Sequence, residues 1–201
     1  DYRLAPRHRF PTAADDTHTG WEWLQQQGFR PDRMVIAADS AGGHLAADLL
    51  VHGAQPHPAA LCLFSPLVDM TLQAARGREK HRPDPAIRAG DAARLVQLYC
   101  RDVDPSHPRL AHDITAAGRA FPPTLIQAGG AEMLAADAEL LAERIRATGA
   151  HCELQIWPDQ VHVFQALPRL SPEATRAIRA AAQFLCAALP ADTSERAACG
   201  R

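Results

Sequence analysis

One serine stands at the apex of a stretch of small residues, Asp39-Ser40-Ala41-Gly42-Gly43. A short apolar run at 34–38 precedes this stretch, and leucines at helical spacing follow it. The pattern predicts a strand that turns sharply into a helix, with the Ser40 hydroxyl exposed above the carboxyl edge of a sheet. A serine held there can act as a nucleophile, because the free N–H groups of the helix N-terminus can meet developing negative charge.

The turn departs from the usual Gly-x-Ser-x-Gly pattern at its first position, where Ala38 replaces glycine. Alanine adds one methyl group, which this turn can hold if its φ angle is negative. We expect Gly42 and Ala38 to keep the neighbours of Ser40 from colliding where the chain reverses. An ordinary strand–loop–helix with a capping serine explains these five residues equally well.

Strand and helix patterns alternate along the chain, which predicts an α/β fold with a mostly parallel sheet and helices on both faces. The expected strands are 34–38, 59–64, 124–127 and 152–157, and the expected helices are 12–28, 41–53, 91–100, 134–148 and 172–189. Residues 71–123 otherwise show little regular pattern, and the charged stretch 76–83 is expected to be a loop. A segment of this kind indicates a functional surface or an insert.

Chemically active side chains follow the other expected strands, on the same edge of the sheet as Ser40. Asp69 follows 59–64, Glu132 follows 124–127, and Asp159 and His162 follow 152–157. Ligands of parallel sheets bind at this edge. Histidine can take a serine proton near neutral pH, and a carboxylate behind the ring fixes its tautomer. The sequence therefore predicts nucleophilic catalysis by Ser40 with His162 as the base; the alternative for His162 is a packed loop histidine.

Three acids are candidates for the partner of His162. We favour Glu132, which lies directly after its strand. Asp137 is the alternative acid, although the helix dipole alone explains a carboxylate at the start of a helix. Asp69, after the preceding strand, is the third candidate. The order Ser40, Glu132, His162 is the nucleophile–acid–histidine order of α/β-hydrolases.

The other histidines give no metal-binding spacing, so no metal is expected. His44, His52 and His57 are expected on a helix surface or in loops, with neither an H-x-H nor an H-E-x-x-H pattern. Five cysteines without a C-x-x-C pair indicate neither a disulfide framework nor a zinc site. The cysteines at 62, 152 and 186 lie in apolar runs and are expected to be core residues.

The composition is typical of one globular domain and excludes several classes of partner. The chain has 201 residues and a formal net charge of −2, which gives no reason to expect nucleic acid or an anionic membrane surface as a partner. It contains no apolar run long enough to span a bilayer, and its opening residues give no reason to expect a signal peptide. A reducing, cytoplasmic location is expected from these features and from the cysteine usage.

Several motifs together carry a family resemblance. They include Asp1-Tyr2-Arg3-Leu4-Ala5-Pro6, the Ser40 turn, Ser65-Pro66-Leu67-Val68-Asp69, Ala131-Glu132-Met133-Leu134 and Trp157-Pro158-Asp159-Gln160-Val161-His162-Val163-Phe164-Gln165. From residue 1 to about 189 the chain resembles the hormone-sensitive-lipase family of α/β-hydrolases, specifically its bacterial esterases. The resemblance implies hydrolysis of small-molecule esters with short to medium chains through an acyl-serine, with Ser40 as nucleophile, His162 as base and Glu132 as acid. It implies no cofactor.

The resemblance also implies that the chain is N-terminally truncated. The family's His-Gly-Gly-Gly oxyanion loop, its cap helices and its first strands precede the segment that this chain opens with. Residues 1–190 are expected to be the C-terminal portion of an α/β-hydrolase domain, and 191–201 a disordered tail. Of the family's oxyanion donors, only the N–H of Ala41 is then expected, and the strand 34–38 is expected to be an exposed edge that favours association, with a homodimer as one outcome.

Two alternatives to an active esterase follow from this comparison. One is a catalytically silent member of the fold that holds a ligand in the old pocket. The other is an inactive fragment that lacks the oxyanion loop. Ser40, Glu132 and His162 together favour the esterase over the silent member.

Overall fold

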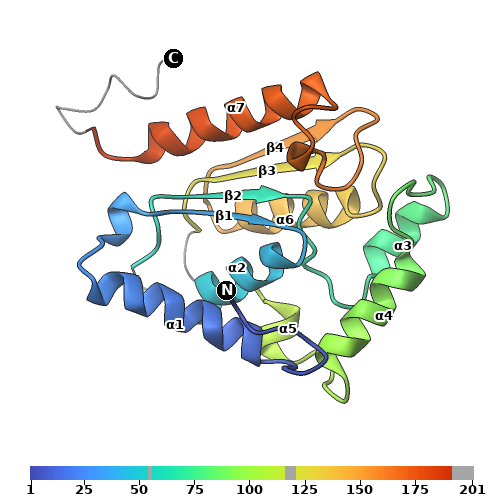
Figure 1. Cartoon of the computed structure of the whole chain (residues 1–201), viewed down its shortest axis with the longest axis horizontal. Coiled ribbons are helices and arrows are strands. Elements are labelled where there is room, and N and C mark those ends of the chain that lie inside the picture. Colours follow the sequence, from blue (N-terminus) through green and yellow to red (C-terminus); the bar gives the residue numbers. More distant parts are fainter. Residues whose placement is uncertain (54–55, 116–120, 192–201) are drawn as a thin grey trace.

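Four parallel strands form the centre of the computed structural model, which describes residues 1–53, 56–115 and 121–191 (Figure 1). In spatial order these strands are β1 (Val35–Asp39), β2 (Ala60–Phe64), β3 (Thr124–Gly129) and β4 (Cys152–Trp157). Each strand pairs in parallel with the next one in the chain. The predicted strands and their parallel arrangement are therefore confirmed.

The register of the sheet aligns the carboxyl ends of the strands. Asp39 is paired with Phe64, Phe64 with Gln127, and Gly129 with Trp157. Because all four strands run in the same direction, the loops that follow them leave the sheet at one edge. This edge carries the side chains predicted to do chemistry.

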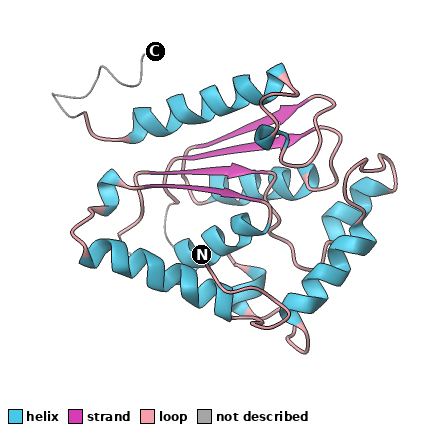
Figure 2. Ribbon diagram, in the orientation of Figure 1, coloured by secondary structure: helices cyan, strands magenta, loops and turns pink. Residues whose placement is uncertain are grey.

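Helices cover both faces of the sheet (Figures 1 and 2). The helices of this layer arrangement are α1 (Thr12–Gln26), α2 (Ala41–His52), α6 (Ala135–Ala147) and α7 (Pro172–Ala188), with short 3₁₀ turns η1 (Pro31–Arg33) and η2 (Phe164–Ala166). Helices α2 and α6 lie on one face, and α7 lies alone on the other in this view, while α1 packs against α2. These four helices match the predicted ones.

The side chains of successive residues of β2 are buried on opposite faces of the sheet. Leu61 and Leu63 belong to the large core cluster on the side of α2 and α6. Cys62 packs instead with Leu125 of β3 and Ala181 of α7. Because helices cover both faces, β2 is an unbroken apolar run rather than an alternating one.

The segment 71–123 contains more helix than its sequence indicates. Its helices are α3 (Gln73–Glu79), α4 (Ala89–Cys100) and α5 (Pro108–Ala111), of which only α4 matches a predicted helix. The prediction of a loop at 76–83 is therefore wrong over its first half, which belongs to α3. Buried Leu72 and Ala75 pack in one cluster with Ala89 and Met133, and this tertiary packing stabilises a short, charged helix with little intrinsic pattern.

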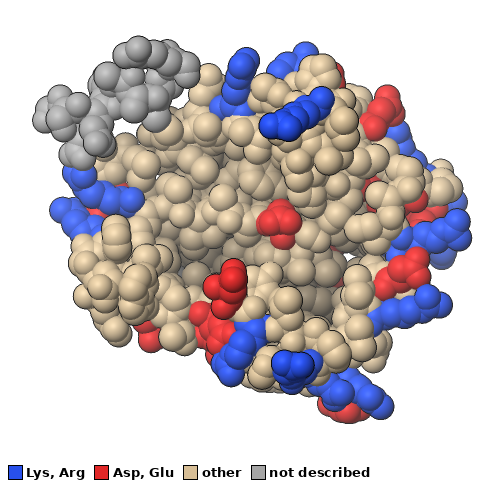
Figure 3. All heavy atoms as spheres, in the orientation of Figure 1, with Lys and Arg blue, Asp and Glu red and all other residues tan. Residues whose placement is uncertain are grey.

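Two smaller sequence expectations have different outcomes. Cys62 and Cys152 are buried as expected, but Cys186 is exposed on α7, so the prediction of a core position is wrong for it. The predicted disordered tail lies, from residue 192 onward, outside the described residues. None of the helices in the described part of the chain is long and apolar enough to cross a membrane. On the face drawn in Figure 3, basic and acidic side chains are interspersed around the periphery.

Candidate active site

Ser40 occupies the turn between β1 and α2 in a backbone conformation that only a constrained site retains. Its φ and ψ angles are 50° and −122°, and a non-glycine residue with positive φ carries strain. The turn is held by backbone hydrogen bonds, because the N–H of Ser40 donates to the Phe64 carbonyl at 2.9 Å and the Leu67 N–H donates to the Ser40 carbonyl at 2.9 Å. The strand-to-helix turn predicted from the sequence is present, with the serine at its apex.

The glycine that the turn requires most is Gly43 rather than Gly42. A Cβ added at Gly43 would lie 2.6 Å from the Cβ of Pro66, whereas one added at Gly42 would meet the Cβ of Ala38 at an ordinary 3.5 Å. Ala38 itself lies within β1, in extended backbone, where its methyl group is accommodated. The expected role of Gly42 therefore belongs mainly to its neighbour.

Ser40, His162 and Glu132 form one continuous hydrogen-bonded line. Nε2 of His162 lies 2.9 Å from Oγ of Ser40, and Nδ1 of the same ring lies 2.7 Å from Oε2 of Glu132. The side chain of Glu132 is fully buried and that of His162 is 11% exposed. A proton on Nδ1, shared with the carboxylate, leaves the lone pair of Nε2 facing the serine hydroxyl.

The other oxygen of Glu132 is held by two donors. Oε1 accepts a hydrogen bond from the Ser65 hydroxyl at 2.7 Å and another from the Gly129 N–H at 2.5 Å. Oγ of Ser65 in turn accepts from the N–H of Val163, next to His162, at 3.0 Å. The sequence analysis does not predict Ser65 as a site residue, although it directly follows β2 at the edge that carries the other site residues.

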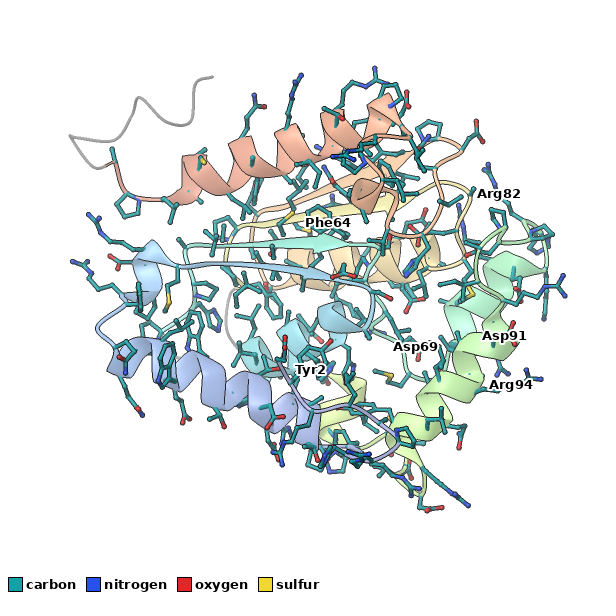
Figure 4. The ribbon with its side chains drawn as sticks, viewed as in Figure 1. Tyr2, Phe64, Asp69, Arg82, Asp91 and Arg94 are labelled. Carbon is teal, nitrogen blue, oxygen red and sulfur yellow. The ribbon has the colours of Figure 1, made fainter. Side chains whose placement is uncertain are left out.

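The two alternative acids are engaged elsewhere. Oδ1 of Asp137 accepts from the N–H groups of Val68 and Asp69, at 3.3 and 3.0 Å, and burial raises the pKa of Asp137 to about 6. Asp69 lies in the loop between β2 and α3 (Figure 4), where its carboxylate accepts from the N–H of Thr71 at 2.8 Å and that of Gln73 at 3.0 Å. The carboxylate that accepts from the His162 ring is that of Glu132.

A largely apolar cavity of about 350 Å³ opens beside the serine. Ser40, Ala41 and His162 line it, and Ala41 is the first residue of α2, where backbone N–H groups have no partner within the helix. Its remaining walls come from the N-terminal segment, the loop after β2, α4 and the loop after β3, and include Tyr2 (labelled in Figure 4), Leu4, Leu67, Met70, Leu95, Val96, Tyr99 and Met133. The segment 71–123 thus contributes a wall of the cavity through α4.

The sequence model of the alpha/beta hydrolase fold family matches residues 1–166. This chain belongs to the α/β-hydrolase family. Among solved structures, an esterase of the bacterial hormone-sensitive lipase family superposes with a TM-score of 0.86 and 34% identity, over 94% of this chain and 65% of that one. A hormone-sensitive lipase from a metagenome library gives a TM-score of 0.85 and 33% identity, over 94% and 66%. The predicted resemblance to bacterial esterases of this family is confirmed.

Two proteins of Mycobacterium tuberculosis are similar in sequence to this α/β-hydrolase. Carboxylesterase/phospholipase LipF is 39% identical over 92% of this chain and 52% of its own length. Esterase LipU is 36% identical over 92% of this chain and 65% of its own length. The chain therefore spans between about half and two thirds of the length of these relatives, and the structure is part of an α/β-hydrolase fold.

In this α/β-hydrolase, Arg78, which the sequence placed in a charged loop, and Asp84, which directly follows that loop, hold the backbone around Glu132. Arg78 of α3 donates from Nε to the Glu132 carbonyl and from Nη2 to the Gly130 carbonyl, both at 2.9 Å. Asp84 accepts from the Met133 N–H at 2.8 Å. These hydrogen bonds hold the loop after β3 from α3 and the segment that follows it. No local sequence pattern predicts them.

The α/β-hydrolase also buries a histidine that was expected on a helix surface. His44, on α2 one turn after Ser40, is 1% exposed and lines the cavity, because α1 and α5 both pack on α2. Its Nδ1 lies 3.0 Å from Nε2 of His112. Burial lowers the pKa of His44 to about 4 and that of His112 to about 3, so both rings are neutral at pH 7. His52 is exposed and His57 lies in a loop, as predicted.

Proposed function

We propose that this chain carries the catalytic centre of a serine carboxylesterase. In this proposal Ser40 is the nucleophile, His162 the general base and Glu132 the acid that orients the ring. The observation that carries it is the unbroken line from Ser40 Oγ through both nitrogens of His162 to the buried carboxylate of Glu132, with Ser40 and His162 lining an apolar cavity. The names of the relatives, carboxylesterase and esterase among them, support the same reaction class.

The first half of the reaction forms an acyl-enzyme. Nε2 of His162 takes the proton of Ser40 as Oγ attacks the ester carbonyl, and the buried carboxylate of Glu132 stabilises the resulting imidazolium. The carbonyl oxygen becomes an oxyanion beside the N–H of Ala41, at the N-terminus of α2. One such donor is worth roughly 3–4 kcal/mol in the transition state. The imidazolium then gives its proton to the departing alcohol.

The second half returns the free enzyme. His162 takes a proton from a water molecule, which attacks the acyl-serine carbonyl, and the acid product leaves when Oγ of Ser40 regains its proton. The same hydrogen bond between Glu132 and Nδ1 serves both halves. The chain's own residues supply every proton acceptor that this sequence of steps needs.

The cavity favours esters of short to medium chain length. Its volume of about 350 Å³ lies at the small end of the range for ligand pockets, roughly 300–1,000 Å³. Its walls are mainly aliphatic and include Leu67, Val96 and Met133. An apolar acyl or alkyl group therefore gains from burial there, while a long chain would extend past the walls.

Two measurements on the purified chain test the proposal. A fluorophosphonate probe should label the wild-type chain. It should also label the control variant Ser106→Ala, because Ser106 is an exposed serine distant in sequence from Ser40, Glu132 and His162. Ser40→Ala should abolish the labelling. A p-nitrophenyl ester series from acetate to decanoate should show turnover that falls at the long end.

Three outcomes distinguish the alternatives. Equal labelling of Ser40→Ala would contradict the assignment of the nucleophile. Binding of a non-hydrolysable ester without any turnover or labelling would favour the catalytically silent member of the fold. Absence of binding, labelling and turnover would favour the inactive fragment.

A further inference from the structure

Three potential metal ligands converge between α2 and the end of α5, outside the line of Ser40, His162 and Glu132. Asp48 and His52 lie one turn apart on α2, and His112 directly follows α5. One ligand atom from each residue lies within 4.8 Å of the other two. We propose that Asp48, His52 and His112 form a binding site for one divalent transition-metal ion of the zinc type.

The buried ring of His112 has an unused nitrogen. Its Nε2 lies 3.0 Å from Nδ1 of His44, whereas Nδ1 of His112 has no hydrogen-bond partner among the described residues. His112 is fully buried, so no solvent reaches this atom. A buried polar atom without a partner costs free energy and calls for an explanation. A metal ion on Nδ1 supplies the partner, since a neutral imidazole can ligate through one nitrogen and donate through the other.

Both histidines have the outer contacts that a metal-ligating imidazole requires. Such a ring usually donates its second N–H to a carbonyl or another acceptor, which fixes the tautomer and the ring orientation. Nε2 of His52 lies 3.2 Å from the Pro108 carbonyl, and Nε2 of His112 faces the Nδ1 of His44. In each ring Nδ1 is therefore the nitrogen left for the metal.

Asp48 completes the ligand set and gives the site its negative charge. Its side chain is fully buried. Oδ2 accepts from His18 and from Arg109 Nη2, both at 2.8 Å, and Oδ1 accepts from Arg109 Nε at 3.0 Å. Oδ1 keeps a free lone pair with which it can bind a metal ion. The Arg109 guanidinium is shared with Asp15 at 2.8 Å. Two carboxylates around one guanidinium leave a net negative charge, which favours a cation. The exposed side of His52 connects the site to solvent.

The donor set selects the class of metal. Two imidazole nitrogens with one carboxylate oxygen suit zinc, cobalt or nickel, whereas calcium and magnesium prefer oxygen ligands alone. Binding also has a consequence for the cavity. A metal ion on Nδ1 of His112 requires that the ring proton be on Nε2, which then donates to Nδ1 of His44. The occupied site therefore fixes the tautomer of His44, which lines the cavity.

Calorimetric titration of the chelator-treated chain with Zn²⁺ tests the proposal. The background carries Cys186→Ser, so that this exposed thiol does not compete. One equivalent should bind the wild-type site and the His151→Ala control, which removes an exposed histidine away from the cluster. His52→Ala, a change at an exposed residue that leaves the core intact, should weaken binding at least about 100-fold. No stoichiometric binding, or equal binding by His52→Ala, would overturn the proposal.

Two further measurements identify the ligands. Imidazole ¹⁵N spectra should show Zn²⁺ shifting Nδ1 of His112, and His112→Gln with native circular dichroism should lose the binding. Ca²⁺ under the same conditions should give no heat of binding. A zinc-dependent shift that is confined to histidines outside the cluster, or equal binding of Ca²⁺, would contradict the assignment.

Discussion

The hydroxyl of Ser65 donates to Oε1 of Glu132 at 2.7 Å, on the carboxylate oxygen opposite the one that faces His162. Ser65 is itself buried, with a positive φ of 49°, and it accepts from the N–H of Val163. One side chain therefore connects the loop after β2, the acid after β3 and the backbone beside the histidine after β4. This arrangement makes Ser65 a positioning residue for the proposed reaction.

Replacement of Ser65 by alanine should lower kcat about 10-fold with little change in KM. Oε1 of Glu132 would lose one of its two donors, and the ring of His162 would be oriented less strictly toward Ser40, while the walls of the cavity would be unchanged. Steady-state kinetics with a p-nitrophenyl ester measure the two constants. Ser171→Ala is the control, because Ser171 caps α7. It should cost about 1 kcal/mol of stability and leave kcat unaltered; an equal fall in kcat for both variants would contradict the positioning role.

Glu132→Gln should lower kcat by about 10³–10⁴-fold, while Asp137→Asn should lower it less than about 10-fold. An amide at residue 132 presents an N–H₂ group to Nδ1 of His162 as readily as an oxygen, so the required tautomer is lost. Asp137 contacts backbone N–H groups of the loop after β2 instead of the ring. Single-turnover acylation of both variants measures the difference. The reverse order of the two effects would assign the acid to Asp137.

The buried carboxyl of Asp137 predicts a pH-dependent stability. Burial raises its pKa to about 6 in the folded chain, against about 3.9 when unfolded, so its stabilising protonated form is lost as pH rises through this window. Asp137→Asn removes the titration and keeps an acceptor for the N–H groups of Val68 and Asp69. Its stability relative to the wild type should therefore increase by about 2 kcal/mol from pH 4.5 to 7.5. Urea unfolding at both values measures this, and a constant difference would refute it.

The two glycines after Ser40 should respond differently to alanine. Gly43→Ala places a methyl group 2.6 Å from the Cβ of Pro66, so backbone must shift, at a cost of about 1–3 kcal/mol. Gly42→Ala meets Ala38 at 3.5 Å and gains helix propensity, so its effect should lie between neutral and about 1 kcal/mol of stabilisation. Thermal unfolding measures both. Equal destabilisation would show that the whole turn, rather than the contact with Pro66, excludes a side chain.

Local patterns were sufficient for the sheet, its covering helices and the candidate triad. The buried run of β2 and the stripe of α6 follow from periodicity, since parallel strands with helices on both faces are apolar throughout. Parallel strands also bring their carboxyl ends to one edge, so the positions of Ser40, Glu132 and His162 after their strands predicted their proximity. That prediction used only the order of residues along the chain.

Contacts between distant segments decided the rest. The hydrogen bonds from Arg78 and to Asp84 that hold the loop of Glu132 join residues about 50 positions apart in the sequence. Helix α3 forms because buried Leu72 and Ala75 pack against other segments, not because of its own charged sequence. The burial of His44 and its approach to His112 depend on α5 covering α2. The spacing of residues along a chain predicts which side chains are neighbours on one helix or strand. Contacts between side chains of separate elements depend instead on tertiary packing, whose energy is the sum of many weak contacts, and no single sequence motif predicts that sum.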